Sequence, residues 1–309
     1  MTTSRSRQIV RSALFVPASS ERFLRSAERS AADAVILDLE DSVTESSRDA
    51  ARRLAGEFGE RAEPGGPSVF ARINPLSAGQ LDADLDAVVR LSLGAVLLPK
   101  ICDPSEVAEL DRQLSWHEGH RGLSHGTVRI WPLIETPAAI SVVDQIATAS
   151  PRVAFLGGAI SDGGDLVSSL GLEVQPDGLE SLYIRSRVLI AARAAGVHNP
   201  VTGLCTDIDD LDGLEQAARR GRALGYEGMM VIHPSHVPIV NRVFSPSTDE
   251  VAEARRVLDA LDVADRNGTG AARLDGRMID VAMAKSAHLV IERDARARDR
   301  SRRHQDDQR

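Results

Sequence analysis

Eight short apolar runs alternate with helix-like segments along most of the chain, and this alternation constrains the fold more than any other feature. Most of the runs are continuously apolar, which is typical of parallel strands that are buried on both faces. They span residues 13–17, 34–40, 68–74, 95–100, 129–135, 153–158, 200–203 and 228–234. Eight strand–helix repeats predict an α/β fold, a (β/α)8 TIM barrel over residues 11–246, close to the usual size of about 250 residues. An open doubly wound sheet is the alternative, but no GxGxxG motif follows the first run, where a dinucleotide-binding fold needs it.

Outside the barrel the sequence changes character. Residues 1–10 are expected to be a flexible N-terminus. Residues 247–295 predict a C-terminal helical arm or lid, with an N-terminal cap at Ser247 or Thr248, a polar connector that contains glycine, and a second helix from about Met278 to Arg293. Residues 296–309 are a charge run in which alanine is the only apolar residue, and such a run predicts a disordered tail.

Charge and composition narrow the class of partner. The net charge of −8 argues against a general surface for nucleic acid or anionic membranes. No apolar run approaches the length that a membrane span needs, and the N-terminus lacks the apolar region of a signal peptide. Cys102 and Cys205 do not have the spacing of metal ligands. We therefore expect a cytoplasmic protein without a nucleic-acid or membrane partner.

Ionisable side chains stand at the carboxyl ends of the predicted strands, where (β/α)8 enzymes place their active sites. A buried charge costs several kcal/mol unless it is paired or bound to a metal, so packing alone explains the set poorly. Mg2+ takes one or two carboxylates together with water and substrate oxygens, and Glu135 and Asp165 are the predicted ligands. With the polar but uncharged Asn74, the whole set at the strand ends comprises Asp38, Glu40, Asp41, Arg72, Asn74, Lys100, Glu135, Asp165, Asp207 and His233.

The neighbours of this predicted metal pair have two possible roles each. Glu40 and Asp41 are expected to accept hydrogen bonds from metal-bound water, or else to be neutralised by nearby arginines. Arg72 offers a bidentate fork for a substrate carboxylate, and it could also neutralise Asp38. Lys100 raises the alternative of Schiff-base aldol chemistry, although its acidic surroundings suit a metal better.

Nine segments between residues 11 and 246 resemble the HpcH/HpaI aldolase and citrate lyase β-subunit family, of the phosphoenolpyruvate-binding barrel superfamily. They are RSALFVPASSERF, DAVILDLEDSV, ARINPL, AVLLPK, PLIET, GGDLVSSLG, LYIRSRVLIAARAAG, TDIDDLDGL and GYEGMMVIHPSHVPIVNRVFSP. The resemblance implies cleavage of carbon–carbon bonds in carboxylic acids or coenzyme A thioesters with Mg2+, for which Mn2+ could substitute. It places the metal on Glu135 and Asp165 and substrate oxygens on Arg72. Counting from the preceding strand would select Asp162 in place of Asp165.

The arm carries a second resemblance. DGRMIDVAMAKSA resembles the lid of the malyl-, citramalyl- and β-methylmalyl-CoA lyases, which implies that Asp280 is an acid/base that often reaches a neighbouring subunit. The alternative is an aspartate at a helix N-terminus, favoured by the helix dipole. Arg22 and Arg25 could meet the phosphates of coenzyme A, or they could form a solvated helix face.

The predicted function is a Mg2+-dependent lyase that cleaves a β-hydroxyacyl-CoA of the citramalyl or malyl type into an acyl-CoA and a 2-keto acid. Three alternatives stay open: a malate-synthase-like or thioesterase activity, a class II aldolase that acts on free keto acids, and a citrate lyase β-subunit within a larger complex. The resemblance also implies a homo-oligomer, a trimer or a hexamer.

Overall fold

The computed structural model describes residues 10–63, 65–158, 160, 163–197 and 199–306. The chain forms two compact units, Met1–Asn241 and Arg242–Arg309. The first unit ends five residues before the barrel boundary that the sequence predicts. The expected flexible N-terminus lies outside the described residues except for Val10, which is buried.

The first unit is built on an eight-stranded parallel sheet in the order β5-β4-β3-β2-β1-β8-β7-β6. β5 and β6 complete the circle through isolated bridges, Ile130 with Val153 and Leu133 with Gly157. The strands therefore form a nearly closed barrel, as predicted. Their bounds are β1 Ser12–Pro17, β2 Ala34–Asp38, β3 Ser68–Arg72, β4 Leu93–Leu98, β5 Arg129–Pro132, β6 Phe155–Gly157, β7 Asn199–Thr202 and β8 Gly228–Val231.

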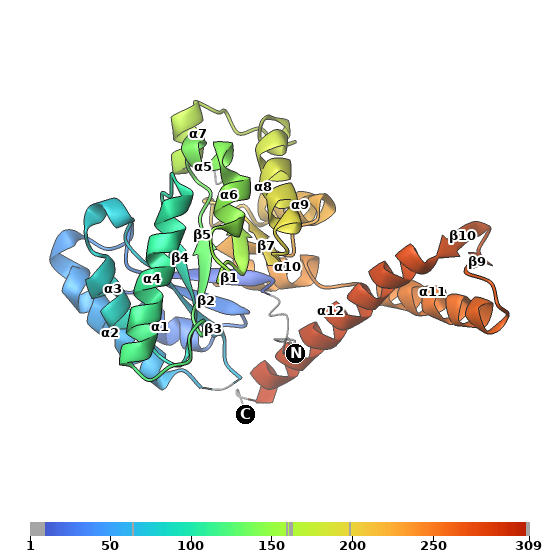
Figure 1. Ribbon diagram of the computed structural model, residues 1–309, viewed down its shortest axis with the longest axis horizontal. Coiled ribbons are helices and arrows are strands. Elements are labelled where there is room, and N and C mark those ends of the chain that lie inside the picture. Colours follow the sequence, from blue (N-terminus) through green and yellow to red (C-terminus); the bar gives the residue numbers. More distant parts are fainter. Residues whose placement is uncertain (1–9, 64, 159, 161–162, 198, 307–309) are drawn as a thin grey trace. The chain divides into compact units, whose positions relative to one another are not determined.

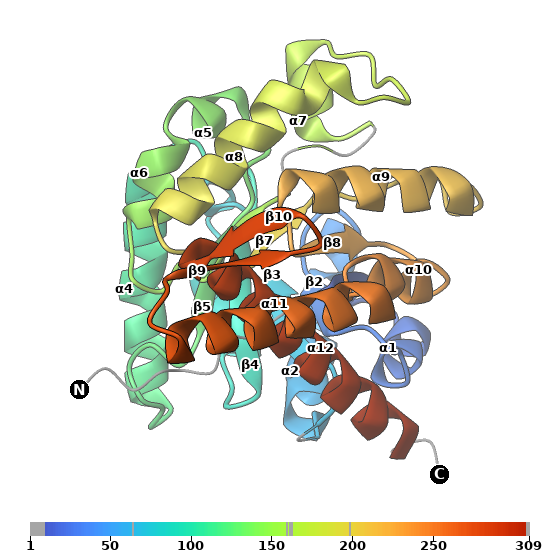
Figure 2. The ribbon, with the colours of Figure 1, turned by 90° about the vertical axis from the view of Figure 1, so that its right-hand side faces the viewer.

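Helices surround the strands of this unit (Figures 1 and 2). Local chemistry fixes where they begin: α4 starts with a capping box between Asp103 and Glu106 and with Pro104 in its first turn. The helices are α1 Glu21–Glu28, α2 Arg48–Arg61, α3 Leu81–Val88, α4 Pro104–His120, α5 Pro137–Ser141, α6 Val143–Thr148, α7 Asp165–Leu170, α8 Leu182–Ala194, α9 Leu211–Leu224 and α10 His236–Val243.

The barrel interior is filled by large side chains. Phe70, Trp131 and Phe155 pack together, with ring centroids 5.1–6.2 Å apart. These rings belong to a buried cluster that takes residues from β1 to β8. A filled interior of this kind is a packed core, so the open space that a ligand can use lies at the strand ends.

The second unit contains two helices and a hairpin: α11 Thr248–Arg266, β9 Ala271–Leu274, β10 Arg277–Asp280 and α12 Val281–Asp306. Ser247 caps α11 through a capping box with Glu250, as expected. The second helix was expected from about Met278, but residues 277–280 pair with residues 271–274 in an antiparallel hairpin and α12 begins at Val281. Residues 296–306, where a disordered tail was expected, continue α12. The reason is that arginines of the charge run follow acids by four residues, as Arg298 follows Asp294, and such pairs stabilise a helix.

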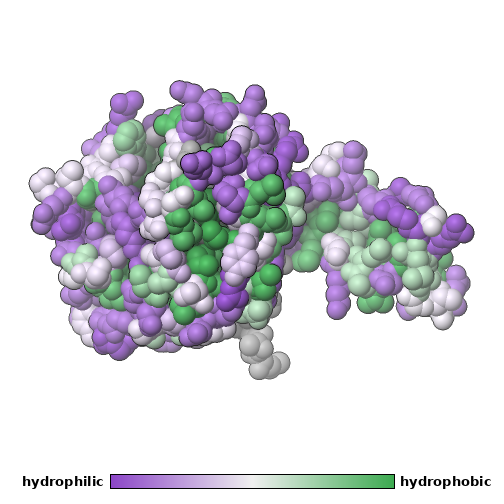
Figure 3. Space-filling view, turned by 90° about the horizontal axis from the view of Figure 1, so that it is seen from above, coloured by the Kyte–Doolittle hydropathy of each residue, from purple (hydrophilic) through white to green (hydrophobic). Residues whose placement is uncertain are grey.

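Apolar side chains also reach the surface of the first unit, as Figure 3 shows on the side that carries α7 and α8 in Figure 1. Large exposed residues of α8 and the turn before it are Leu179, Leu182, Tyr183 and Ile190. Within the described part of the chain, none of the helices combines the length and apolar character that crossing a bilayer would take.

Candidate active site

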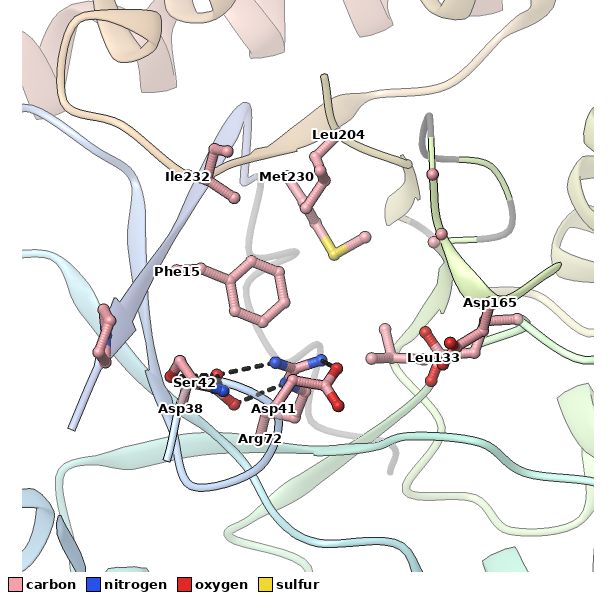
Figure 4. Close-up of a pocket in the computed structure, with 15 residues that line it drawn as sticks. Phe15, Asp38, Asp41, Ser42, Arg72, Leu133, Asp165, Leu204, Met230 and Ile232 are labelled. Atoms are coloured by element: carbon pink, nitrogen blue, oxygen red, sulfur yellow. Dashed lines mark hydrogen bonds and ion pairs between the residues drawn. The ribbon is translucent and has the colours of Figure 1, made fainter. Parts of the chain in front are cut away.

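A cavity of about 490 Å³ lies at the carboxyl ends of the barrel strands. One wall is charged and contains Asp38, Asp41, Arg72, Glu135 and Asp165. The opposite wall is apolar. It is formed by side chains of β1 and β8 and of the residues that follow β7 and β8: Phe15, Leu204, Met230 and Ile232. Figure 4 shows Leu204, Met230 and Ile232 across the cavity from Arg72, with the Phe15 ring between them and the guanidinium.

Arg72 and Asp38 form the centre of the charged wall. The last residue pair of the β2–β3 ladder brings them side by side. Nε and Nη2 of Arg72 donate to Oδ1 and Oδ2 of Asp38 at 2.6 and 2.7 Å, which is a bidentate fork. Burial alone would raise the pKa of Asp38, but the hydrogen bonds and charge of Arg72 outweigh it and hold this pKa below its usual range. The pair is therefore ionised.

Glu40 and Asp41 extend this network to Lys100. Nη1 of Arg72 lies 2.9 Å from Glu40 and 3.0 Å from Asp41, and Nζ of Lys100 lies 2.6 Å from Glu40 and 2.9 Å from Asp41. Burial raises the pKa of Glu40. Desolvation would lower the pKa of Lys100, but its bonds to Glu40 and Asp41 prevail and raise it. A lysine held protonated in this way is a poor amine nucleophile, which disfavours the Schiff-base alternative.

The predicted metal ligands face the same cavity. Burial raises the pKa of Glu135 to about 7, although the backbone N–H of Lys100, at 2.7 Å from its Oε1, and the charge of Arg72 partly oppose this. Asp165 is the first residue of α7, and its Oδ2 lies 3.7 Å from Nζ of Lys100. The charge of Asp165 adds to the rise in the pKa of Glu135.

A divalent cation fits this donor set. Glu135 is a desolvated carboxylate whose ionised form is only partly compensated by the Lys100 N–H and by Arg72, and a bound cation would complete the compensation. Among the described residues, no group of three or more His, Cys, Asp and Glu side chains could hold a metal ion. A site with two carboxylates suits Mg2+, which keeps several water or substrate oxygens among its ligands. Asp162, the other candidate ligand, lies outside the described residues.

Lys100 joins the two halves of the charged wall. It is one of two residues other than glycine for which a positive φ is recorded in the described chain, at 51°. This left-handed conformation costs of order 1–3 kcal/mol, and it persists only where the surroundings hold it. Here the main-chain N–H reaches Glu135 while the side chain reaches Glu40 and Asp41.

Other residues that the sequence singled out have structural partners. Asn74 is buried and donates to Asp84 and to the Leu39 carbonyl. Asp207 accepts hydrogen bonds from backbone N–H groups two and three residues later, and His233 bonds Ser235. Arg22 and Arg25 are exposed on α1, and Arg25 pairs with Glu21 at 2.7 Å.

Asp280 ends β10 in the second unit. Its Oδ1 accepts hydrogen bonds from the backbone N–H groups of Ala282 at 2.9 Å and Met283 at 3.3 Å. It therefore caps α12, as the helix-dipole alternative expects. An exposed capping carboxylate keeps its second oxygen for other partners, so the cap is compatible with an acid/base role.

The sequence analysis missed the apolar wall and Ser42. Oγ of Ser42 donates to Asp38 at 2.5 Å, and the guanidinium carbon of Arg72 lies 4.9 Å from the ring centroid of Phe15. A signal was present, because Phe15, Met230 and Ile232 belong to the predicted strands over residues 13–17 and 228–234, whose carboxyl ends were expected to form the site. The search of those ends considered ionisable residues only.

Comparison with known proteins places these residues in context. Residues 11–234 match the model of the family described as HpcH/HpaI aldolase/citrate lyase. The chain is 32% identical to citrate lyase subunit beta of Haemophilus influenzae, over 92% of this chain and 96% of that protein. It is 34% identical to a (3S)-malyl-CoA thioesterase of Cereibacter sphaeroides, with coverage of 93% and 94%. It is 28% identical to the mitochondrial citramalyl-CoA lyase of Rattus norvegicus, with coverage of 91% and 85%.

A solved structure agrees with these sequence matches. It is that of CitE from Mycobacterium tuberculosis in complex with magnesium, acetoacetate and coenzyme A. The two chains share 30% sequence identity and superimpose with a TM-score of 0.72, and the match covers 94% of this chain and 99% of the other. The likeness thus extends over both the fold and the sequence.

Proposed function

Because the chain belongs to the HpcH/HpaI aldolase/citrate lyase family, we propose that it is a Mg2+-dependent carbon–carbon lyase. Its substrate would be a β-hydroxyacyl-CoA of the citramalyl or malyl type, cleaved to an acyl-CoA and a 2-keto acid. One observation carries the proposal: two carboxylates and an arginine fork face an apolar wall across a single cavity. The charged side suits the acid end of such a substrate, and the apolar side suits its acyl carbons.

Glu135 and Asp165 would hold the metal. Bound Mg2+ would supply Lewis-acid stabilisation of the charge that develops on the substrate oxygens. The solved relative that contains magnesium and coenzyme A supports this assignment by similarity. Lys100 and Arg72 neutralise Glu40, Asp41 and Asp38, and they keep these acids from competing for the cation.

Arg72 would also bind the carboxylate or carbonyl oxygens of the substrate. A guanidinium has five N–H donors. The hydrogen bonds to Asp38 and Asp41 use three of them, Glu40 lies 2.9 Å from Nη1 as an ion pair, and one N–H of Nη2 is left for a ligand. Asp38 fixes the plane of the guanidinium, so the remaining donor has a defined direction before the substrate arrives. Such preorganisation is what positions a reacting group.

Cleavage of a β-hydroxyacyl-CoA requires a proton donor for the α-carbon of the acyl product. The β-hydroxyl loses its proton as its oxygen becomes the keto oxygen of the product, and the bond between the α- and β-carbons breaks and leaves its electron pair next to the thioester carbonyl. The resulting enolate must be protonated at the α-carbon, so the step as a whole moves one proton from oxygen to carbon. We assign the proton donor to Asp280, which would act as the base in the condensation direction. Its exposed position and the resemblance of the M-I-D segment to the CoA-lyase lid support the assignment. Arg22 and Arg25 are the candidate contacts for coenzyme A phosphates, and both are exposed.

A thioesterase is the second candidate function. The observation that favours it is the 34% identity to a (3S)-malyl-CoA thioesterase over 93% of this chain. The two activities differ in product, because hydrolysis releases free coenzyme A thiol and lysis releases a keto acid. We also propose that the chain forms a homo-oligomer, a trimer or hexamer, and the exposed apolar residues of α8 support this.

The test is a product assay on the purified full-length chain. (S)-Citramalyl-CoA, (S)-malyl-CoA and a free 4-hydroxy-2-keto acid are each incubated with Mg2+, and keto acid, acyl-CoA and free thiol are measured together. Keto acid without free thiol is the expected result. Free thiol in equal amount would transfer the assignment to the thioesterase, and cleavage of free 4-hydroxy-2-keto acids alone would transfer it to the aldolase alternative.

A further inference from the structure

Arg185 and Arg220 are half-buried arginines outside the cavity wall, and neither forms an ion pair with a described acid. Arg185, in the first turn of α8, donates from Nε to the Ser181 hydroxyl and from Nη1 to the Thr202 hydroxyl, each at 3.0 Å. Both acceptors are neutral and buried, at 1% and 3% exposure. Burial lowers the pKa of Arg185, in contrast to Arg72, where carboxylates raise it. A half-buried guanidinium held only by hydroxyls carries an uncompensated charge.

Arg220, on α9, approaches the same turn from the other side. A Cβ placed on Gly178 would lie 3.6 Å from Nε of Arg220 and 3.6 Å from Oγ of Ser181. Arg220 is half-buried, and its charge adds to the lowered pKa of Arg185. The two guanidiniums therefore repel each other across the turn over residues 178–181. α8 and α9 lie near each other in both Figure 1 and Figure 2.

One acid lies in this turn. Both carboxylate oxygens of Glu180 are buried, and neither accepts a hydrogen bond from the described residues. Glu180 raises the pKa of Arg185, but its effect is smaller than those of burial and Arg220. It offsets one of the two positive charges without pairing with either arginine. The net charge of Arg185, Arg220 and Glu180 together is therefore positive.

The unused N–H donors of Arg185 also favour an anionic ligand. A guanidinium has five N–H groups, and among the described residues Arg185 donates two of them, to Ser181 and Thr202. The hydroxyls of Ser181 and Thr202 fix its plane, as Asp38 does for Arg72. A fixed guanidinium with free donors matches the oxygens of a carboxylate or a phosphate. Thr202 ends β7 and lies two residues before Leu204 of the cavity wall. The cluster is therefore adjacent in sequence to the active site, but none of its residues lines the cavity.

We infer that Arg185 and Arg220, together with Ser181 and Thr202, form an oxyanion-binding site between α8, α9 and the end of β7. Its ligand is an anionic group with several equivalent oxygens, a phosphate or a carboxylate. Such a group would bridge the two guanidiniums, remove their repulsion and satisfy their free donors. This inference goes beyond the proposed lyase activity and does not depend on it.

Direct binding of inorganic phosphate tests the inference, with acetate in parallel as the simplest carboxylate. Titration calorimetry on the full-length chain is expected to show binding, and Arg185→Gln or Arg220→Gln should weaken it about tenfold or more, the effect of losing a hydrogen bond to a charged group. Arg219→Gln is the matched control. Arg219 precedes Arg220 on α9 but is paired with Glu215, so its loss should leave binding unchanged. Stronger binding of phosphate or of acetate identifies which group the site prefers.

Two further variants separate a binding role from a packing role. Glu180→Gln removes the one offsetting charge, so phosphate binding should become several-fold tighter by the Coulomb attraction alone. If Glu180 is instead the structural counter-ion of Arg185, this variant lowers the melting temperature and phosphate binding does not improve. Arg185→Lys keeps the charge and serves if Arg185→Gln fails to fold, with weaker binding expected. Equal binding in wild type and both Arg→Gln variants, or no binding of either anion, would overturn the inference.

Discussion

Arg72→Met should destabilise the barrel strongly, because Arg72 balances buried acids. Asp38 is 2% exposed and Glu40 7%, and both lie within 2.9 Å of the guanidinium. Removing one partner of a buried ion pair costs roughly 3–5 kcal/mol, since the remaining charge stays buried and unpaired. Total stabilities are only about 5–15 kcal/mol, so the loss should be easy to detect. Arg72→Lys keeps the charge but loses the fork, and it should cost about 1.5–3 kcal/mol.

Urea unfolding followed by tryptophan fluorescence measures this effect. Both tryptophans of the chain, Trp116 and Trp131, lie in the first unit, so the signal reports on the barrel. Arg53→Met is the control, because Arg53 forms an exposed pair with Glu57 and should change stability by less than about 0.5 kcal/mol. The double variant Asp38→Asn/Arg72→Met should lose less than the sum of its single variants. Additive losses, or a loss under about 1 kcal/mol for Arg72→Met, would refute the reasoning.

Three further predictions concern the cavity and the strands beneath it. Because burial raises the pKa of Glu135 from 4.5 to about 7, the folded chain keeps a proton that the unfolded chain loses in this range, so stability should fall as pH rises from about 4.5 to 7. The pH dependence of the urea midpoint should be flatter in Glu135→Gln, and identical profiles would contradict the assignment. Lys100→Met should tighten Mg2+ binding in calorimetry relative to Lys100→Arg, because it removes a positive charge 3.7 Å from Asp165 and frees Glu40 and Asp41; equal affinities or weaker binding would argue against a metal at this place. Gly157→Ala should cost about 1–3 kcal/mol in urea unfolding, because its Cβ would collide with the carbonyl of Val201 at a φ of 153°; unchanged stability would show that the strands can move apart.

The strands could be predicted from sequence because each is an apolar run between turn signals. β2 and β3, for example, begin at the predicted residues and end two residues early, where the chain leaves the ladder with charged side chains. The grouping of Asp38, Arg72 and Glu135 followed from one rule, that strand ends of a barrel meet at one face. The strands and this grouping of side chains could be predicted because both follow from the positions of the apolar runs in the sequence.

Three other features were not predicted: the hairpin of the second unit, the left-handed conformation of Lys100 and the contact between Arg185 and Thr202. The hairpin of the second unit had a sequence signal, because the dipeptide Asp275-Gly276 favours a two-residue hairpin turn. Both residues adopt the positive φ that such a turn requires. The left-handed φ of Lys100 had no sequence signal, because it is set by bonds to residues more than 30 positions away. The pairing of Arg185 with Thr202 arises where α8 packs on β7, and a sequence pattern does not reveal which arginine lacks an acid.

The central claim is that Glu135 supports metal-dependent cleavage of an acyl-CoA thioester and that Asp280 supplies the proton. The most direct test is keto acid release from (S)-citramalyl-CoA and (S)-malyl-CoA by wild type, Glu135→Ala and Asp280→Ala, each with and without Mg2+. The account predicts Mg2+-dependent release of pyruvate or glyoxylate by wild type and loss of activity in both variants. Full activity in Glu135→Ala, or release by wild type that does not depend on Mg2+, would contradict it.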